Sequence, residues 1–119
     1  MPRYADGFVV PVLKKNLKAY VAMSKRAGKI WKEYGAIEYC ECVGDDLKVS
    51  FGMPFPKLVK PKAGEVIVFS WIVYKSRAHR DRVNAKVMKD ERLQPDLGKE
   101  PPFDLKRMAY GGFEIMVDM

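Results

Sequence analysis

Residues Glu65 to Lys75 carry the strongest strand pattern in the sequence, and this pattern constrains the fold more than any other. Large β-branched and aromatic side chains alternate here on both faces of the predicted strand. One face would carry Val66, Val68, Ile72 and Tyr74, and the other Ile67, Phe69, Trp71 and Val73. Both faces of the sheet must therefore be covered, either by the chain itself or by another molecule.

Changes in apolar periodicity predict the remaining elements. Apolar residues recur at spacings of three and four from Leu17 to Tyr34, which is typical of an amphipathic helix, and Gly35 is placed to end it. Ser76 is placed to cap a second helix. The predicted strands are Phe8–Leu13, Ile37–Val43, Glu65–Lys75 and Tyr110–Met119, and the predicted helices are Leu17–Tyr34 and Arg77 to about Glu91.

The order of these elements is β-α-β-β-α-β, which is that of a ferredoxin-like α+β fold with a four-stranded antiparallel sheet. A chain of 119 residues suits one such domain over residues 1–119. Residues 44–64 form a long connection with three prolines and three glycines, which we expect to be functional, partly stranded or mobile. A polar, proline-containing loop is expected from Pro95 through Lys106.

Two helices can cover only one face of a four-stranded sheet, so the other face needs a second cover. Lys57, Lys60 and Lys62 make the 44–64 connection a poor lid for an apolar surface. We therefore predict a homodimer in which two copies pack these sheet faces against each other.

Charge and cysteine content restrict the environment of the protein. The formal net charge of +7 attracts anionic partners at long range but does not identify one. The longest apolar run, Val66 to Tyr74, is too short for a membrane-spanning helix, so no membrane partner is expected. Cys40 and Cys42 point to one face of a predicted strand and would close too small a ring for an easy disulfide, which suits a reducing cytoplasm.

Five stretches of sequence, which together span nearly the whole chain, carry a family resemblance. They are DGFVVPV (6–12), EYCECVGDD (38–46), VFSWIVYKSRAHRD (68–81), VNAKVM (83–88) and RMAYGGFEIMVD (107–118). The chain thereby resembles the YbaA-like family of uncharacterised bacterial proteins, which carry a domain of unknown function. The resemblance implies a dimeric ferredoxin-like α/β barrel, a fold class shared with small antibiotic-biosynthesis monooxygenases and ligand-binding proteins, and it brings no established activity. Tyr34, where the family often has His, and the proline-rich loop from Leu47 to Lys62 depart from the family pattern.

His79 is the only histidine of the chain and our candidate catalytic residue. It precedes Val83 and Val87 by one and two helical turns, so we expect it to project with this apolar stripe toward the sheet. There its imidazole could accept a proton or contact a ligand, or it could be a structural histidine. The candidate ligand-binding residues are Trp71, Arg80 and Asn84. An arginine here could clamp a ligand carboxylate or phosphate, or form ion pairs on a solvated helix face, and core packing is the alternative for Trp71.

We expect neither a metal nor a cofactor. Cys40, Cys42 and His79 supply three of the four ligands that a structural zinc site needs. The sequence has no glycine-rich phosphate-binding loop, so nucleotide-dependent chemistry has no support. Four carboxylates near the end of the second strand could supply a general base, or could form a strand edge and a turn. They are Glu38, Glu41, Asp45 and Asp46.

Two functional hypotheses come from different parts of the chain. The first is a cytoplasmic homodimer that binds a small organic ligand between sheet and helices, as in a cofactor-free monooxygenase- or isomerase-like enzyme. The alternative is a non-enzymatic protein whose basic first helix binds nucleic acid or an acidic partner. The lysines of this helix fall within a narrow arc, but no aromatic residues interleave with them for base stacking, which favours a solvated face. They are Lys14, Lys18, Lys25, Lys29 and Lys32.

Overall fold

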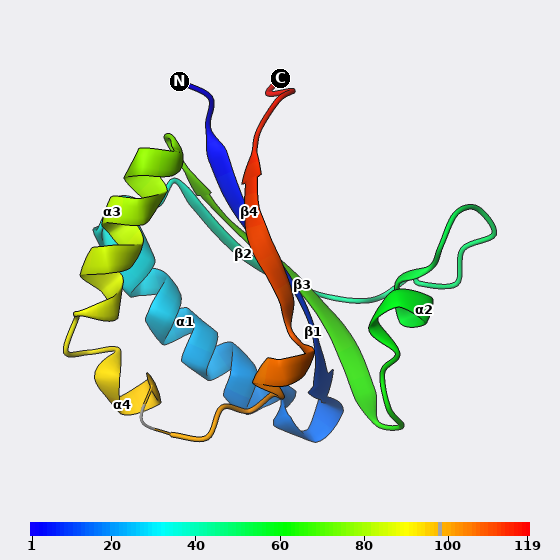
Figure 1. Ribbon diagram of the computed structural model, residues 1–119. Helices are drawn as coiled ribbons and strands as arrows, with labels where there is room; N and C mark the ends of the chain where they lie inside the picture. The colour runs from blue at the N-terminus through cyan, green and yellow to red at the C-terminus, as the bar shows by residue number, and fades with distance from the viewer. Residues whose placement is uncertain (98) are drawn as a thin grey trace.

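The computed structural model describes residues 1–97 and 99–119 and is built around a four-stranded antiparallel sheet (Figure 1). The strands lie in the order β2-β3-β1-β4, so β1 and β3 are central and β2 and β4 form the edges. This α+β arrangement confirms the predicted ferredoxin-like fold. The sheet of one chain is open and does not close into a barrel by itself.

The predicted strands and helices are present with shifted ends. The strands are β1 (Tyr4–Leu13), β2 (Glu38–Val43), β3 (Glu65–Tyr74) and β4 (Ala109–Glu114), and the long helices are α1 (Leu17–Glu33) and α3 (Arg77–Met88). Shorter helical segments are η1 (Lys14–Asn16), α2 (Phe55–Val59), α4 (Gln94–Leu97) and η2 (Leu105–Arg107).

The two strands nearest the chain ends differ from the prediction in length. β1 begins at Tyr4 rather than at Phe8, because Asp6 is paired on both sides and extends the strand instead of ending it. β4 stops at Glu114, the residue paired with Tyr4, because its partner strand begins there. Beyond this point the chain continues with a single backbone hydrogen bond from Ile115 N–H to the Arg3 carbonyl oxygen at 2.9 Å.

The connections contain more helix than predicted. Residues 44–64 hold the short helix α2 and no strand. The helix ends at Val59, and its C-cap residue Lys60 has a left-handed φ of 53°. α3 ends at Met88 rather than near Glu91. The buried side chain of Leu93 then brings the chain back onto the core, and α4 follows where a loop was predicted.

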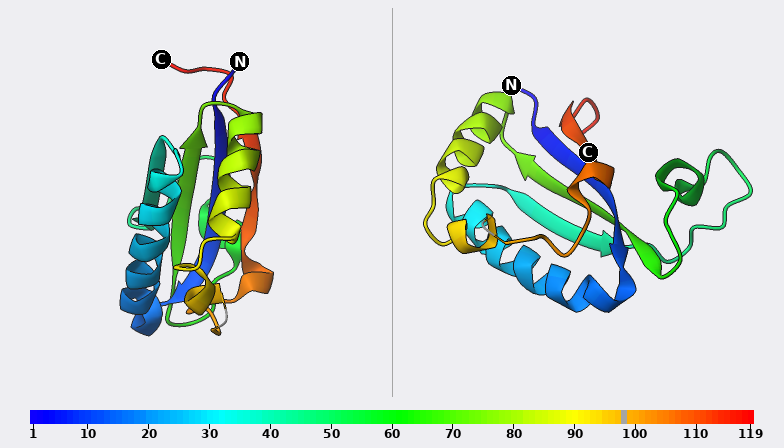
Figure 2. Two further views of the ribbon diagram at one scale, coloured as in Figure 1. Left: turned by 90° about the vertical axis from the view of Figure 1, so that its left-hand side faces the viewer. Right: turned by 60° about the horizontal axis from the view of Figure 1, so that its bottom comes forward.

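Both long helices lie on one face of the sheet (Figure 2). The even-numbered residues of β1 and β3 point toward these helices because side chains alternate along a strand. Burial of these residues against the helices removes apolar surface from water and supplies the main driving force for the fold. The buried apolar residues include Tyr4, Val10, Val12, Val68, Ile72 and Tyr74 from the strands, and Tyr20, Ala27, Ile30, Val83 and Val87 from the helices.

The opposite face of the sheet lies outside the cover of α1 and α3. Phe69 on β3 is 42% exposed there and Phe113 on β4 is 64% exposed. Phe55 of α2 packs edge-on against Phe69 with 6.1 Å between the ring centroids. The segment that carries α2 extends away from the body of the protein, and its Phe51 is 93% exposed (Figure 1). The 44–64 connection, predicted to be a poor lid, therefore covers part of this face through α2, and Ile67 and Val73 are buried there. Phe69 and Phe113 leave the remaining apolar surface open.

Glu65 and Arg107 form a two-pronged ion pair that ties η2 to the start of β3. Arg107 Nη1 donates to Glu65 Oε2 at 2.7 Å, and Nη2 donates to Oε1 at 2.8 Å. The backbone N–H of Lys62 also donates to this carboxylate at 2.6 Å. These hydrogen bonds, led by those from Arg107, lower the pKa of Glu65 to about 2.

We expect Glu65→Gln to lower the free energy of unfolding by about 1–3 kcal/mol at neutral pH, because the neutral amide replaces a carboxylate that accepts charge-assisted hydrogen bonds. The folded pKa of Glu65 lies below its ordinary value of 4.5, so the stabilisation is complete above that pH and is lost as the pH falls toward about 2. Urea unfolding at neutral and acidic pH measures the difference. Glu100→Gln, at an exposed position, is the control, and equal losses in both variants would contradict the prediction.

Candidate functional site

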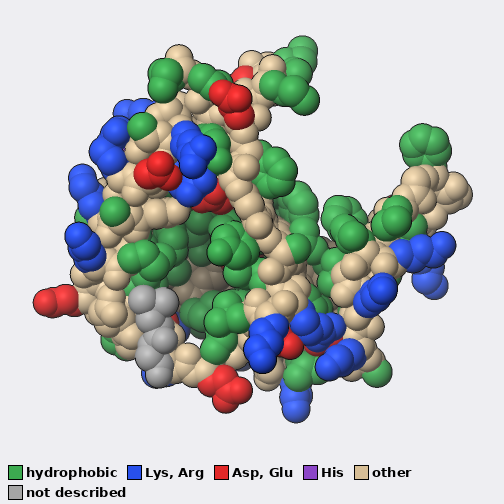
Figure 3. All heavy atoms as spheres, in the orientation of Figure 1, with side chains coloured by type: hydrophobic (Ala, Val, Ile, Leu, Met, Phe, Trp, Pro, Cys, Tyr) green, Lys and Arg blue, Asp and Glu red, His purple; other side chains and the backbone are tan. Residues whose placement is uncertain are grey.

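A cavity of about 540 Å³ lies between the helix-covered face of the sheet, α1, α3 and residues within 93–96 and 99–108. Figure 3 shows it as a hollow between α3 and β4, with hydrophobic side chains on its walls. Its apolar lining includes Phe8, Met23, Ala27, Met88, Phe103 and Tyr110. A cavity of this size and character can hold an organic molecule of ordinary metabolite or drug size.

A polar cluster in the wall of this cavity is built around Asp6 on β1 and Arg80 on α3. Asp6 Oδ1 lies 3.4 Å from Arg80 Nε. Arg80 Nη2 donates to the Tyr4 hydroxyl at 3.1 Å, and the guanidinium carbon lies 4.9 Å from the centroid of the Tyr4 ring. Gly112 on β4 is paired with Asp6, and a Cβ there would lie 2.5 Å from Arg80 Nη2. The cluster therefore depends on the missing side chain at Gly112.

The Asp6 carboxyl is buried, with 8% of the residue exposed. Burial raises the pKa of Asp6 above the ordinary aspartate value of 3.8, because removal from water disfavours the charged form. The Arg80 charge and hydrogen bonding with Tyr74 and Asn84 lower this pKa but do not cancel the effect of burial.

Asn84 joins α3 to α1 and β3 at the same cluster. Its Oδ1 accepts hydrogen bonds from Trp31 Nε1 at 3.0 Å and from the Tyr74 hydroxyl at 3.1 Å. Trp31 Nε1 also lies 3.1 Å from the Tyr74 hydroxyl oxygen. Because three elements share these hydrogen bonds, the side chains beside Asp6 are held in defined positions.

A second polar cluster lines the cavity around Glu41 of β2. The Tyr20 hydroxyl donates to Glu41 Oε1 at 2.9 Å, and Ser24 Oγ donates to Oε2 at 2.5 Å. The hydroxyl oxygens of Ser24 and Tyr39 are 2.9 Å apart. Burial raises the pKa of Tyr39 to about 12, so its hydroxyl is protonated at neutral pH and can donate a hydrogen bond.

Among the predicted ligand-binding residues, Arg80 and Asn84 come together in the wall of the cavity. The Trp71 side chain lies on the other face of the sheet, since it alternates with the inward-facing Ser70. Its indole N–H donates there to Glu38 Oε1 at 2.7 Å. Trp71 is thus one of the residues that line the cavity, but its indole ring lies on the opposite face of the sheet.

The structure places His79 outside the cavity lining. The imidazole Nδ1 of His79 accepts a hydrogen bond from the backbone N–H of Lys75 at 3.0 Å. The backbone N–H of His79 donates to Ser76 Oγ at 3.1 Å, which confirms Ser76 as the N-cap of α3. A Cβ at Gly35 would lie 3.1 Å from His79 Nε2. Burial and three nearby cations lower the pKa of His79. These contacts give His79 a structural place at the start of α3 rather than a place in the cavity.

The sequence analysis missed Asp6 as a site residue. Its position before Gly7 resembles the edge of a strand, but the alternation of Phe8 and Val10 continues backward through Asp6 to Tyr4 on the inner face. This alternation of inward-facing residues along the strand is the sequence signal that places Asp6 on the inner face. The register of the sheet then brings Asp6 to the polar cluster, which no local pattern shows.

The basic residues of α1 lie on its exposed side, away from the cavity. Arg26 pairs there with Asp96, with 2.8 Å between Nη2 and Oδ1. The aromatic residues Tyr20 and Trp31 of the same helix line the cavity instead. The helix thus separates a charged outer face from an aromatic inner face.

In the part of the chain that the structure describes, no group of three or more His, Cys, Asp and Glu side chains is arranged to hold a metal ion. No helix of residues 1–97 and 99–119 has both the length and the apolar character needed to cross a membrane. Cys40 and Cys42 are free thiols.

The chain is thus a ferredoxin-like α+β protein with a cavity between its sheet and its helices. Residues 3–105 match the family described as a protein of unknown function, DUF1428. The chain is 42% identical over 116 residues to the uncharacterized protein YbaA of Escherichia coli K12, with 98% of each chain covered, and equally similar to YbaA of Shigella flexneri. The chain therefore belongs to this family of uncharacterised proteins, and the resemblance found in the sequence is confirmed.

Two crystal structures have similar folds. One is a dimeric ferredoxin-like protein from an uncultured marine organism, with a TM-score of 0.62 and 16% identity over the whole of both chains. The other is an uncharacterized NIPSNAP domain protein from Burkholderia xenovorans, with a TM-score of 0.51 and 12% identity, covering 92% of this chain and 91% of the other. At these identities the similarity concerns the fold alone.

Two adjacent glycines of β4 test the packing of the polar cluster. A Cβ at Gly112 would collide with Tyr4 and Arg80, whereas the nearest atom to a Cβ at Gly111 is 3.9 Å away on Phe113. We expect Gly112→Ala to lower the free energy of unfolding by about 1–3 kcal/mol, and Gly111→Ala to change it by less than about 0.5 kcal/mol. Urea denaturation measures both. Equal stability of the two variants would show that Tyr4 and Arg80 do not pack against β4 as described.

Proposed function

We propose that this protein binds a small organic ligand in the cavity between the sheet and the helices. The observation that carries the proposal is an apolar cavity of about 540 Å³ whose wall contains the ordered polar cluster of Asp6, Arg80 and Asn84. Binding sites for small molecules combine such an apolar body with a few fixed polar groups. A solid core would have favoured a structural protein instead.

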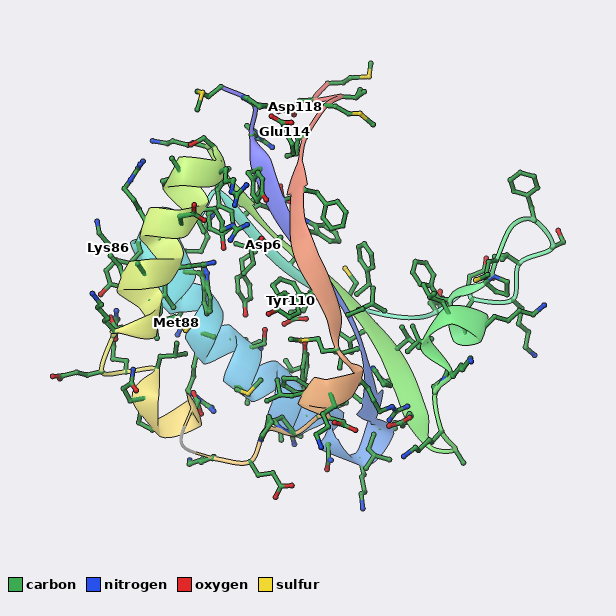
Figure 4. The ribbon with its side chains drawn as sticks, viewed as in Figure 1. Asp6, Lys86, Met88, Tyr110, Glu114 and Asp118 are labelled. Atoms are coloured by element: carbon green, nitrogen blue, oxygen red, sulfur yellow. The ribbon has the colours of Figure 1, made fainter. Side chains whose placement is uncertain are left out.

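The distribution of polar groups indicates the kind of ligand. The Asp6 cluster and the Glu41 cluster offer hydrogen bonds at separate places, while Met88 and Tyr110 contribute apolar surface to the lining (Figure 4). A mainly apolar molecule with oxygen substituents fits this arrangement best. Such a site suits a cofactor-free enzyme of the monooxygenase or isomerase type, because the chain's own carboxyl and hydroxyl groups can supply proton transfer.

The neutral fluorescent probe N-phenyl-1-naphthylamine tests whether the cavity accepts apolar molecules. We expect Met88→Trp to weaken binding of this probe at least about tenfold, because the larger side chain takes up space in the cavity and an affinity change of this size needs only about 1.4 kcal/mol. Ala85→Trp is the control, since Ala85 is exposed on α3 and outside the lining. Unchanged binding in Met88→Trp would place the probe elsewhere and contradict the proposal.

We propose further that the protein is a homodimer that packs the open sheet faces of two copies together. Phe69 and Phe113 are exposed on this face, and monomeric soluble proteins rarely leave such apolar surface uncovered. The similar marine protein is dimeric, which supports self-association without fixing the interface. A cytoplasmic location is part of the same proposal, since the free thiols of Cys40 and Cys42 suit a reducing compartment.

Sedimentation equilibrium tests the dimer and its interface. We expect a mass of twice 13.6 kDa for the natural chain. Phe69→Lys should raise the dissociation constant at least about 100-fold, because the charged group would be buried at the centre of the interface. Val21→Lys introduces the same charge at an exposed apolar position on α1 and should leave the dimer intact. A monomer in the natural chain, or equal effects of the two variants, would contradict the proposed interface.

Binding of nucleic acid or an acidic partner through the basic face of α1 stays a prediction from sequence. The lysines are exposed, but the helix directs its aromatic side chains inward, so the stacking contacts that usually accompany single-stranded nucleic acid binding are absent from this described face. The cavity is the better supported site.

A further inference from the structure

The setting of Asp6 differs from that of a surface aspartate. Its carboxyl is largely buried yet belongs to the cavity lining, so a ligand in the cavity can reach it (Figure 4). The 3.4 Å contact with Arg80 Nε is longer than an ordinary charge-assisted hydrogen bond. Arg80 Nε is itself buried without a hydrogen-bond partner among the described residues. A loosely paired carboxyl and guanidinium therefore stand together in the wall of an apolar cavity.

The groups around Asp6 come from every element packed against it. Arg80 and Asp81 of α3 are the nearby charged side chains, and Tyr74 of β3 and Tyr4 of β1 are the other titratable groups of the cluster. Burial raises the pKa of Asp6 more than the single cation lowers it. The carboxyl can therefore give and take a proton nearer to neutral pH than an exposed aspartate can.

Glu41 and Asp96 are the other carboxylates among the described residues that line the cavity. Asp96 is held in a two-pronged ion pair with Arg26. Glu41 is also less suited to proton transfer than Asp6. Each of its oxygens already accepts a hydroxyl hydrogen bond, from Tyr20 and from Ser24. These hydroxyl groups occupy the positions where a ligand proton would arrive. Its cluster is better suited to orient a ligand.

We propose that Asp6 is a catalytic acid–base that moves a proton within a bound, mainly apolar carbonyl compound, a role that rests on the ligand site proposed above. The Asp6 carboxylate accepts a proton from the carbon next to the carbonyl group. The electron pair of the broken C–H bond forms a C=C bond, and the carbonyl π pair moves onto oxygen to give an enolate. Asp6 then returns the proton to the same carbon or to a conjugated one, so no oxidant or reductant is consumed.

Arg80 keeps the charges balanced during this transfer. When Asp6 takes the proton, its negative charge passes to the ligand oxygen. Arg80 then keeps its contact with the exposed Asp81 carboxylate, with 3.3 Å between Nη1 and Oδ1. The Arg80 guanidinium, whose Nε lies 3.4 Å from Asp6 Oδ1, then attracts the enolate oxygen. A fixed positive charge thus stands where negative charge develops. Proton transfer inside the cavity therefore requires no unpaired charge in an apolar environment.

Exchange of carbon-bound hydrogen in D₂O tests this role with the bicyclic ketone 2-tetralone as the probe. Proton NMR follows the loss of the signals next to the carbonyl group, and saturation-transfer NMR reports whether the ketone is bound. We expect the natural chain to accelerate exchange over buffer, and Asp6→Asn to reduce the acceleration by about 100-fold or more. Glu91→Gln, an exposed carboxylate beyond the end of α3, is the control and should keep the full rate.

The pH dependence of exchange by the natural chain keeps the test valid if Asp6→Asn fails to fold. The reactive form of Asp6 is the carboxylate, so the protein-dependent rate should rise with pH and level off above the pKa of Asp6. Catalysis by solvent hydroxide would instead increase without a plateau. A rate without a plateau, or full activity in folded Asp6→Asn, would overturn the role of Asp6.

The outcome also separates this inference from the ligand site itself. If 2-tetralone binds and does not exchange faster than in buffer, the acid–base role is wrong while the ligand site stands. If the ketone neither binds nor exchanges, the assignment to carbonyl compounds is wrong as well, and the naphthylamine experiment then decides whether the cavity takes apolar molecules at all.

Discussion

The antiparallel pairing of β1 with β3 sets the character of both sides of the sheet. Their register runs from Tyr4 opposite Tyr74 to Leu13 opposite Glu65. Because side chains alternate along a strand, this register directs one set toward the helices and the other toward the open face. A slip of one residue would exchange the two sets and bring Phe69 under the helices in place of Ser70. The cavity and the exposed apolar face are thus consequences of one pairing.

The helix-covered side combines an apolar core with polar groups that the backbone brings together. Asp6 and Arg80 are distant in sequence, and their meeting requires both the β1–β3 register and the packing of α3 on the sheet. Gly112 contributes by leaving room for the guanidinium beside β4. Such a cluster raises the cost of folding, since buried polar groups must be satisfied. A core that only stabilises the fold has no need of buried polar groups in a cavity wall. A binding or catalytic site uses such groups to contact its ligand.

The open side presents the opposite problem. Its apolar side chains Phe69 and Phe113 are only partly covered by the same chain, through the contact of Phe55 with Phe69. A second copy of the same face would cover it symmetrically, and the strands of two sheets would then enclose a shared apolar interior. In that arrangement the ligand cavity lies on the helix side of each sheet and the interface on the other side, so binding and assembly use separate surfaces.

The sequence by itself determined the order of the elements, the fold class and the family, because apolar periodicity and turn residues are local signals. Arg80 and Asn84, predicted from the sequence as ligand-binding residues, lie in the cavity lining, and their role there stays a prediction. Only the tertiary structure decided that His79 lies against Gly35 and that Asp6 lies in the cavity wall. The reason is that contacts between distant segments depend on strand register and helix packing, and neither is encoded in the spacing of neighbouring residues.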